Sequence, residues 1–194
     1  MKLCFATNND HKLKEVQQLV GEQFELLTLN DIGYEGEIPE DYETMEENSL
    51  QKAQFIFDRY QINCFADDSG LEVDALNGAP GVYSARYAGP QRSHEDNNQK
   101  LLTELSEAAI RTGRFKAVIS LIIGGEVRQF EGVVEGTIAR SLQGEGGFGY
   151  DPLFIPSGYE ITFAEMSDQK KNRLSHRGIA IARLVDYLKG LSND

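Results

Sequence analysis

Apolar and polar positions along the chain fall into blocks that predict strands followed by helices. The apolar runs 3–6 (LCFA) and 62–66 (INCFA) have the length and the β-branched or aromatic content of buried strands. Apolar residues recur every three or four positions in 13–20 and 46–60, which predicts a helix in each segment, with Gly21 as the stop signal of the first. Strands that alternate with helices indicate an α/β fold.

The second half of the chain predicts a helix, a hairpin and a final helix. Ser93 has the form of a helix N-cap before an acidic first turn, in which His94 is expected at the surface. The segments 114–123 and 126–134 are predicted strands joined by Gly124-Gly125, a hairpin signal. The remaining predicted elements are strands at 24–29 and 137–139 and helices through 101–108 and 179–188.

Composition and charge narrow the class of partner. The chain has 194 residues, 40% hydrophobic content and a net charge of −12, with no apolar run long enough to span a membrane. Nucleic acid polymers bind basic surfaces, so the charge disfavours them and leaves a small anionic ligand held by local cations. The first residues lack the features of a signal peptide, and Cys4 and Cys64 lie in apolar runs. We therefore expect buried reduced thiols and a cytoplasmic protein.

The richest chemistry follows the apolar run 62–66, where the sequence reads Asp67-Asp68-Ser69-Gly70. Successive strand residues point to opposite faces, so two adjacent carboxylates can share one site only if the strand ends before them. We therefore predict that the strand ends there. Carboxylates at the C-terminal edge of a parallel sheet suit a hard cation such as Mg²⁺. The alternative is a turn of the Asx type that closes the strand without further chemistry.

The sequence from 67 to 89, DDSGLEVDALNGAPGVYSARYAG, closely resembles the signature of the inosine triphosphate pyrophosphatase family, the XTP/dITP diphosphatases. The resemblance runs from Leu3 to the final helix and is strongest at 65–89 and 144–178. It implies one domain over 1–194, with an elongated mixed sheet flanked by helices and two lobes around a central cleft. It also implies Mg²⁺-dependent hydrolysis of ITP, dITP and XTP to the monophosphate and pyrophosphate, and a homodimer.

The polar segment 7–12 lies between the first predicted strand and helix. Backbone N–H groups at a helix N-terminus form a natural phosphate cradle, although a polar loop at this place is also commonplace. No Walker A motif occurs in the chain. The resemblance implies that this loop holds the triphosphate, through Thr7, Asn8, Asn9, Asp10, His11 and Lys12.

An acidic run at 34–47 offers further carboxylates, and such a run is usually a solvated face. The resemblance points to Glu40 as the second Mg²⁺ ligand beside Asp68. It makes Asp68 the catalytic residue that orients or deprotonates the attacking water, and Ser69 a further phosphate donor. Asp67 is expected to be structural and turned the other way. The family commonly shows ETGxTFxENA where this chain reads EDYETMEENS.

A glycine-rich segment at 144–152 (GEGGFGYDP) is the second informative stretch. Glycines allow close approach to a ligand, and the aromatic rings between them can stack on a base, although a flexible hairpin loop explains them too. In the resembling family this segment is the purine pocket. It implies contacts from Phe148 as the stacking platform, from Gly149 and Tyr150, and from Asp151 facing the base.

A basic segment at 170–177 follows and holds four of the 19 lysines and arginines. In a chain of net charge −12, such a local reversal indicates an anion site, with a basic surface turn as the alternative. The resemblance implies that Lys171 contacts the phosphates and that His176 and Arg177 read the purine.

Two other functions fit parts of the pattern. One is a pyrophosphatase of different base specificity, acting on a modified pyrimidine triphosphate. The other is a sensor that binds a nucleotide without turnover, which Asp68, Lys12 and Lys171 argue against. A glycosidase with paired carboxylates leaves the basic segment and the phosphate-type loop unexplained.

Overall fold

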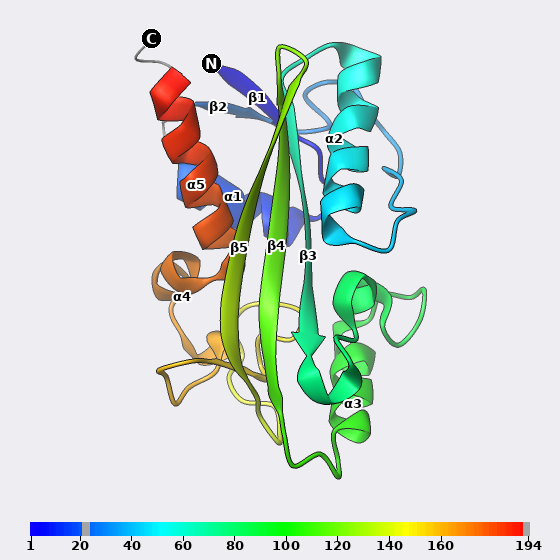
Figure 1. Cartoon of the computed structure of the whole chain (residues 1–194), viewed down its shortest axis with the longest axis vertical. Helices are drawn as coiled ribbons and strands as arrows, with labels where there is room; N and C mark the ends of the chain where they lie inside the picture. Colours follow the sequence, from blue (N-terminus) through cyan, green and yellow to red (C-terminus); the bar gives the residue numbers. More distant parts are fainter. Residues whose placement is uncertain (21–23, 192–194) are drawn as a thin grey trace. The chain divides into compact units, whose positions relative to one another are not determined.

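The computed structural model describes residues 1–20 and 24–191 (Figure 1), so the stop expected at Gly21 lies outside the described residues. The strands are β1 (Lys2–Phe5), β2 (Glu25–Leu27), β3 (Cys64–Val73), β4 (Thr112–Ile123), β5 (Glu126–Ile138) and β6 (Phe154–Pro156). The α-helices are α1 (Asp10–Val20), α2 (Met45–Tyr60), α3 (His94–Glu104), α4 (Asp168–Leu174) and α5 (His176–Leu191). Short 3-10 helices lie at Asp74–Leu76, Gly81–Arg86 and Phe163–Glu165.

The strands form one mixed sheet in the order β2-β1-β3-β4-β5-β6. Strand β1 pairs in parallel with both β2 and β3, whereas β5 and β6 are antiparallel. The CFA tripeptides of β1 and β3 lie side by side, with Cys4 opposite Cys64 and Phe5 opposite Phe65. Both cysteines are free and buried, as expected. The α/β prediction of a mixed sheet flanked by helices is confirmed.

Strand β3 corrects the prediction that the strand ends before Asp67. It continues through Asp67-Asp68-Ser69-Gly70 to Val73, so the two carboxylates point to opposite faces of the sheet. Gly70 is not the glycine of a turn. A Cβ atom at this position would lie 2.2 Å from the Gly81 carbonyl oxygen, so the strand needs a glycine where another backbone passes close to it.

The C-terminal half departs from prediction at three places. Strand β5 runs without a break to Ile138, where two strands were expected, and it pairs with the short strand β6, which the sequence did not reveal. Helix α4, which the sequence did not predict, occupies the first part of the basic segment, where a surface turn was the alternative to an anion site. The Ser167 hydroxyl caps this helix and accepts from Lys170 N. The Gly124-Gly125 hairpin and the Ser93 cap of α3 are confirmed.

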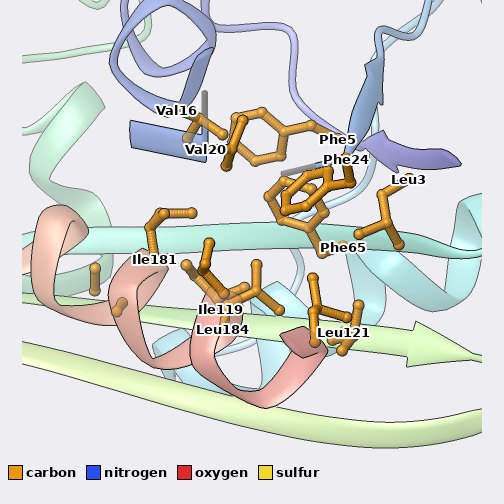
Figure 2. Close-up of a cluster of buried hydrophobic side chains, with 14 residues drawn as sticks. Leu3, Phe5, Val16, Val20, Phe24, Phe65, Ile119, Leu121, Ile181 and Leu184 are labelled. Carbon is orange, nitrogen blue, oxygen red and sulfur yellow. The ribbon is translucent and has the colours of Figure 1, made fainter. Parts of the chain in front are cut away.

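The chain divides into two compact units, and β3, β4 and β5 contribute residues to both. Unit 1 comprises residues 1–68, 117–132 and 177–194. Its largest hydrophobic cluster contains side chains of β1, α1, β3, β4 and α5. Figure 2 shows Phe5, Phe24 and Phe65 together in this cluster, with Ile181 and Leu184 of α5. The rings of Phe5 and Phe65 are stacked with centroids 4.7 Å apart.

Unit 2 comprises residues 69–116 and 133–176. Its core is a separate aromatic cluster in which Phe115 packs against Phe154 and Phe163. Leu101 of α3 and Leu105, the residue that caps its C-terminus, are fully buried in the same cluster, although the helix ends at Glu104 and does not continue to 108 as expected. Each unit therefore has a hydrophobic core of its own.

Candidate functional site

The loop before α1 is held by its own side chains. The Asn9 side-chain oxygen accepts hydrogen bonds from the backbone N–H groups of His11 and Lys12, at 3.0 and 3.1 Å, so Asn9 acts as the cap of α1. The Thr7 hydroxyl accepts from Asn9 N, and the Asn8 amide donates to the Gly36 carbonyl. The loop expected to hold phosphates therefore has a defined conformation at a helix N-terminus.

Four charged residues of unit 1 meet on one face of β3, and we call them the Asp67 cluster: Lys12, Glu15, Asp67 and Arg177. The Lys12 ammonium lies 3.1 Å from one Asp67 oxygen, and Arg177 Nε donates to the other at 3.0 Å. Arg177 also pairs with Glu15 of α1. Arg177 is only 2% exposed, so its guanidinium is buried, with the carboxylates of Asp67 and Glu15 as ion-pair partners.

Burial alone would raise the pKa of Asp67, but the nearby Lys12 and Arg177 outweigh it and hold the pKa well below its usual range. The same burial lowers the pKa of Lys12 despite its pairing with Asp67. Asp67 is thus a permanent anion that organises two cations. This agrees with the structural role expected for Asp67, and places Arg177 beside it in unit 1.

The opposite face of β3 carries a second group, which we call the Asp68 cluster: Glu40, Asn48, Lys52 and Asp68. The Lys52 ammonium lies 2.6 Å from a Glu40 oxygen and 3.3 Å from Asp68 Oδ1. The Asn48 amide donates to Asp68 Oδ2 at 3.3 Å. Helix α2 positions Asn48 and Lys52 one turn apart, so both reach the same carboxylate.

The electrostatics of Asp68 differ from those of its neighbour. Burial raises the pKa of Asp68, and Lys52 and Lys12 offset this only in part. Burial would lower the pKa of Lys52, but Asp68 and Glu40 outweigh it and hold that pKa above its usual value. Two carboxylates here share one ammonium, which leaves Asp68 a more basic carboxylate than Asp67.

The Asp68 cluster has the donor set of a divalent cation site. Glu40 and Asp68 converge on one nitrogen atom, so their oxygens lie within reach of a single cation. Among residues 1–20 and 24–191, no group of three or more His, Cys, Asp or Glu side chains is arranged for a metal. Mg²⁺ is commonly held by one or two carboxylates together with substrate phosphates and water, and this pair fits that pattern.

Unit 2 holds a different group, the Phe148 cluster, formed by Phe148, Asp151 and Lys171. One Asp151 oxygen accepts from the Lys171 ammonium at 2.7 Å and from the Phe148 backbone N–H at 2.8 Å. The ammonium lies 4.8 Å from the centre of the Phe148 ring. Lys171 therefore lies beside the residues expected to bind a base, whereas the resemblance implied that it contacts the phosphates.

Helix α3 supports the same segment. The Asn98 amide donates to the Gly149 carbonyl at 3.0 Å, and Gly149 N donates to His94 Nδ1 at 3.4 Å. Tyr150 is 3% exposed and its hydroxyl donates to the Ser84 carbonyl, so its ring belongs to the core. The buried Tyr150 ring is therefore not available to stack on a base as expected, and stacking by Phe148 stays a prediction.

His176 lies in the same unit. Its ring stacks on Phe115, with centroids 4.7 Å apart and an interplanar angle of 9°. It begins α5, immediately before Arg177, so one short sequence element supplies a side chain to each unit. Ser69, the expected further phosphate donor, lies within β3 directly after Asp68.

Three side chains of these clusters were not foreseen as site residues: Glu15, Asn48 and Lys52. The helical stripe of α2 contained the signal for two of them. Met45, Ala53 and Ile56 are buried at helical spacing, and Asn48 and Lys52 are buried on the same face. A lysine and an asparagine inside an apolar stripe need buried partners, which is a sign of a site.

The fold and these clusters define an α/β protein with buried, paired charges on both faces of a central strand and, in the other unit, an aromatic side chain beside an ion pair. The family model described as "Ham1 family" matches residues 3–187. The chain belongs to the Ham1 family.

Named relatives cover nearly the whole chain. The dITP/XTP pyrophosphatase of Flavobacterium psychrophilum is 48% identical over 189 residues, which is 97% of this chain and 100% of that protein. The dITP/XTP pyrophosphatase of Porphyromonas gingivalis is 50% identical over 188 residues, covering 96% of this chain and 97% of that protein. The resemblance to this family that the sequence motifs indicate is thus confirmed.

Solved structures of similar proteins have the same fold. The Staphylococcus aureus Ham1 protein superposes with a TM-score of 0.90 at 37% identity, covering 98% of this chain and 99% of that chain. A nucleoside-triphosphatase / dITP/XTP pyrophosphatase from Mycobacterium abscessus gives a TM-score of 0.78 at 40% identity, covering 95% and 98%. In the described part of this chain, no helix has the length and apolar character needed to cross a membrane.

Proposed function

We propose that this protein hydrolyses non-standard purine nucleoside triphosphates, namely dITP, XTP and ITP, to the monophosphate and pyrophosphate. The names of its relatives support this, because two proteins at 48% and 50% identity over nearly the full chain are dITP/XTP pyrophosphatases. The observation that carries it is the Asp68 cluster, in which a buried carboxylate of raised pKa lies beside a lysine shared with Glu40.

In the proposed reaction, Asp68 orients a water molecule and accepts its proton as the water oxygen attacks the α-phosphorus. The bond from the α-phosphorus to the bridging oxygen breaks, and pyrophosphate leaves with the electron pair. Asp68 and Glu40 would hold Mg²⁺, which would supply positive charge to offset that of the phosphates. Lys12, Ser69 and the loop before α1 bind the phosphates.

In this proposal, side chains of unit 2 recognise the base. Phe148 stacks on the purine, a contact worth about 1–3 kcal/mol in proteins that stack bases on aromatic rings. Polar contacts to the base come from Lys171, Asp151 and His176. A donor aimed at the 6-keto oxygen of the purine loses its hydrogen-bond partner when adenine presents an amine there. Each such unpaired buried group costs about 1–3 kcal/mol, which disfavours ATP.

Arg177 is proposed to act from the Asp67 cluster, where it is held by Glu15 and Asp67. In this position it keeps Asp67 ionised and so fixes Lys12 for the phosphates. Direct reading of the purine by Arg177, which the resemblance implies, stays a prediction. The homodimer that the resemblance implies and the cytoplasmic location expected from the sequence are also predictions. Light scattering of the purified chain tests the first.

A substrate panel tests the proposal. Pyrophosphate release is measured from dITP, XTP, ITP, dTTP, a modified pyrimidine triphosphate and ATP, each with and without Mg²⁺. The expected result is release from the first three only, and only with the metal. Release chiefly from a pyrimidine triphosphate would favour the alternative specificity, and tight binding of dITP without any turnover would favour a sensor.

A further inference from the structure

Asn48 makes three hydrogen bonds that connect separate parts of the Asp68 cluster. Its side-chain oxygen accepts from Tyr42 N at 2.9 Å, and its amide nitrogen donates to the Tyr42 carbonyl at 3.0 Å. The same nitrogen donates to Asp68 Oδ2 at 3.3 Å. Asn48 is 1% exposed, so the side chain is enclosed by these partners.

These bonds use the two N–H groups of the amide and its oxygen. Two of them attach both backbone polar groups of Tyr42 to α2. Because Glu40 lies two residues before Tyr42 on the same segment, this attachment fixes the backbone that carries Glu40. The third bond reaches the catalytic carboxylate itself.

Asn48 and Lys52 divide the two oxygens of Asp68 between them. Lys52 lies one helical turn after Asn48 and contacts Oδ1, while Asn48 contacts Oδ2. The torsion that rotates a carboxylate about its last bond is broad when nothing restrains it. Two donors from one rigid helix therefore set the orientation of Asp68, and Lys52 links the same oxygen to Glu40.

We propose that Asn48 is a positioning residue, which orients Asp68 and holds the Glu40 segment so that the two carboxylates bind one divalent cation and the attacking water. This inference rests on the proposed function, since it assigns Asn48 a part in that same reaction. Hydrogen-bonded supports of metal-binding carboxylates commonly carry 10- to 100-fold effects on metal affinity or activity.

The chain offers a matched control in Gln51. Its side chain also makes two hydrogen bonds to the same loop, donating to Asp41 Oδ2 at 2.6 Å and accepting from Asp41 N at 2.9 Å. Gln51 lies on the same helix as Asn48, and both of these side-chain hydrogen bonds go to Asp41 rather than to Asp68. Gln51→Ala therefore loosens the loop without removing a donor from Asp68.

The experiment compares Asn48→Ala, Asn48→Leu and Gln51→Ala with the wild type. Asn48→Leu keeps the branched arrangement of heavy atoms and has a stronger helical preference than asparagine, so it serves where the alanine variant does not fold. The readouts are kcat and KM for dITP and, independently of turnover, the dissociation constant of Mn²⁺ for the free protein measured by electron paramagnetic resonance. Thermal unfolding checks that each variant is folded.

We expect kcat to fall by about 10- to 100-fold in both Asn48 variants with KM within threefold, and Mn²⁺ affinity to fall by about tenfold. Gln51→Ala stays within threefold of the wild type on all three readouts. Wild-type kcat and Mn²⁺ affinity in a folded Asn48 variant overturn the proposal, as does an equal loss in Gln51→Ala. If the wild type releases no pyrophosphate from any nucleotide, the proposed function fails, while Mn²⁺ binding still decides the role of Asn48.

Discussion

The charged clusters of unit 1 and the Phe148 cluster of unit 2 differ in the kinds of side chain that they contain. In unit 1, buried carboxylates and cations from three helices meet on both faces of β3. In unit 2, one ion pair between Lys171 and Asp151 lies against an aromatic ring. Paired buried charges suit a polyanion and a metal, whereas a ring beside a single ion pair suits a flat base with a few polar edges.

Two residues that are adjacent in the sequence also differ in their electrostatics. Asp67 and Asp68 are adjacent on one strand, yet their pKa values move in opposite directions because β3 directs them to different partners. Burial acts on both, and two cations in direct contact reverse it for Asp67. The difference supports the proposal that Asp67 is a structural anion and that Asp68, on the other face of the strand, accepts the proton.

The largest effect should come from replacing the proton acceptor. We expect Asp68→Asn to lower kcat for dITP by about 10³-fold, because the amide neither accepts the proton nor binds the metal as a carboxylate does. Steady-state kinetics with Mg²⁺ and thermal unfolding on the same preparation measure this. A folded variant with activity within tenfold of the wild type would show that the chemistry lies elsewhere.

Asp67→Asn should act on stability instead. Removing one partner of a buried ion pair costs about 3–5 kcal/mol, which in a chain of this size lowers Tm by roughly 10 °C. Because the folded pKa of Asp67 is depressed, its contribution is present above the ordinary carboxylate pKa and is lost as pH falls through the folded value. The loss of Tm should therefore be full at pH 7 and shrink in strong acid. An unchanged Tm at pH 7 contradicts this account.

Phe148→Ala tests unit 2. Loss of the stacking surface should raise KM for dITP by about 5- to 100-fold, equivalent to roughly 1–3 kcal/mol, with a smaller change in kcat. Tyr150→Phe is the matched control, since it keeps the buried ring and removes only the hydroxyl that donates to Ser84. Equal rises of KM in the two variants would mean that the loop conformation, not the Phe148 ring, matters.

The smallest effect is a gain in stability. The folded pKa of Asp68 is raised, so the folded state binds its proton more tightly than the unfolded state and loses stability as pH rises from the ordinary value through the folded value. Asp68→Asn should remove this cost and raise Tm at pH 7 by about 2–4 °C, corresponding to roughly 1 kcal/mol. A lower Tm than the wild type would show that Asp68 stabilises the fold as Asp67 does.

Local patterns predicted most of the elements because their causes are local. The buried strands β1 and β3, the stripe of α2, the Ser93 cap and the Gly124-Gly125 hairpin each follow from residues a few positions apart. Motif resemblance added the loops that carry the candidate site. It named Phe148, Asp151 and Lys171 as residues that contact the substrate, and the structure places them in one cluster.

The misses have non-local causes. The two aspartates were expected to end β3 because adjacent strand residues cannot share one site. Instead each faces partners of its own, and those of Asp67, Lys12 and Arg177, lie 55 and 110 residues away in the sequence. Gly70 suggested a turn because its close neighbour, Gly81, comes from another segment. The continuation of β5 to Ile138 depends on pairing with β6, which no periodicity within β5 itself reveals.

The destination of the water oxygen tests the central claim most directly. Hydrolysis of dITP in water enriched in ¹⁸O, followed by mass spectrometry of the products, identifies the phosphorus atom that is attacked. Attack at the α-phosphorus places the label in the nucleoside monophosphate and leaves pyrophosphate unlabelled. Label in pyrophosphate or in orthophosphate would contradict the account, because the water would then have attacked a different phosphorus atom.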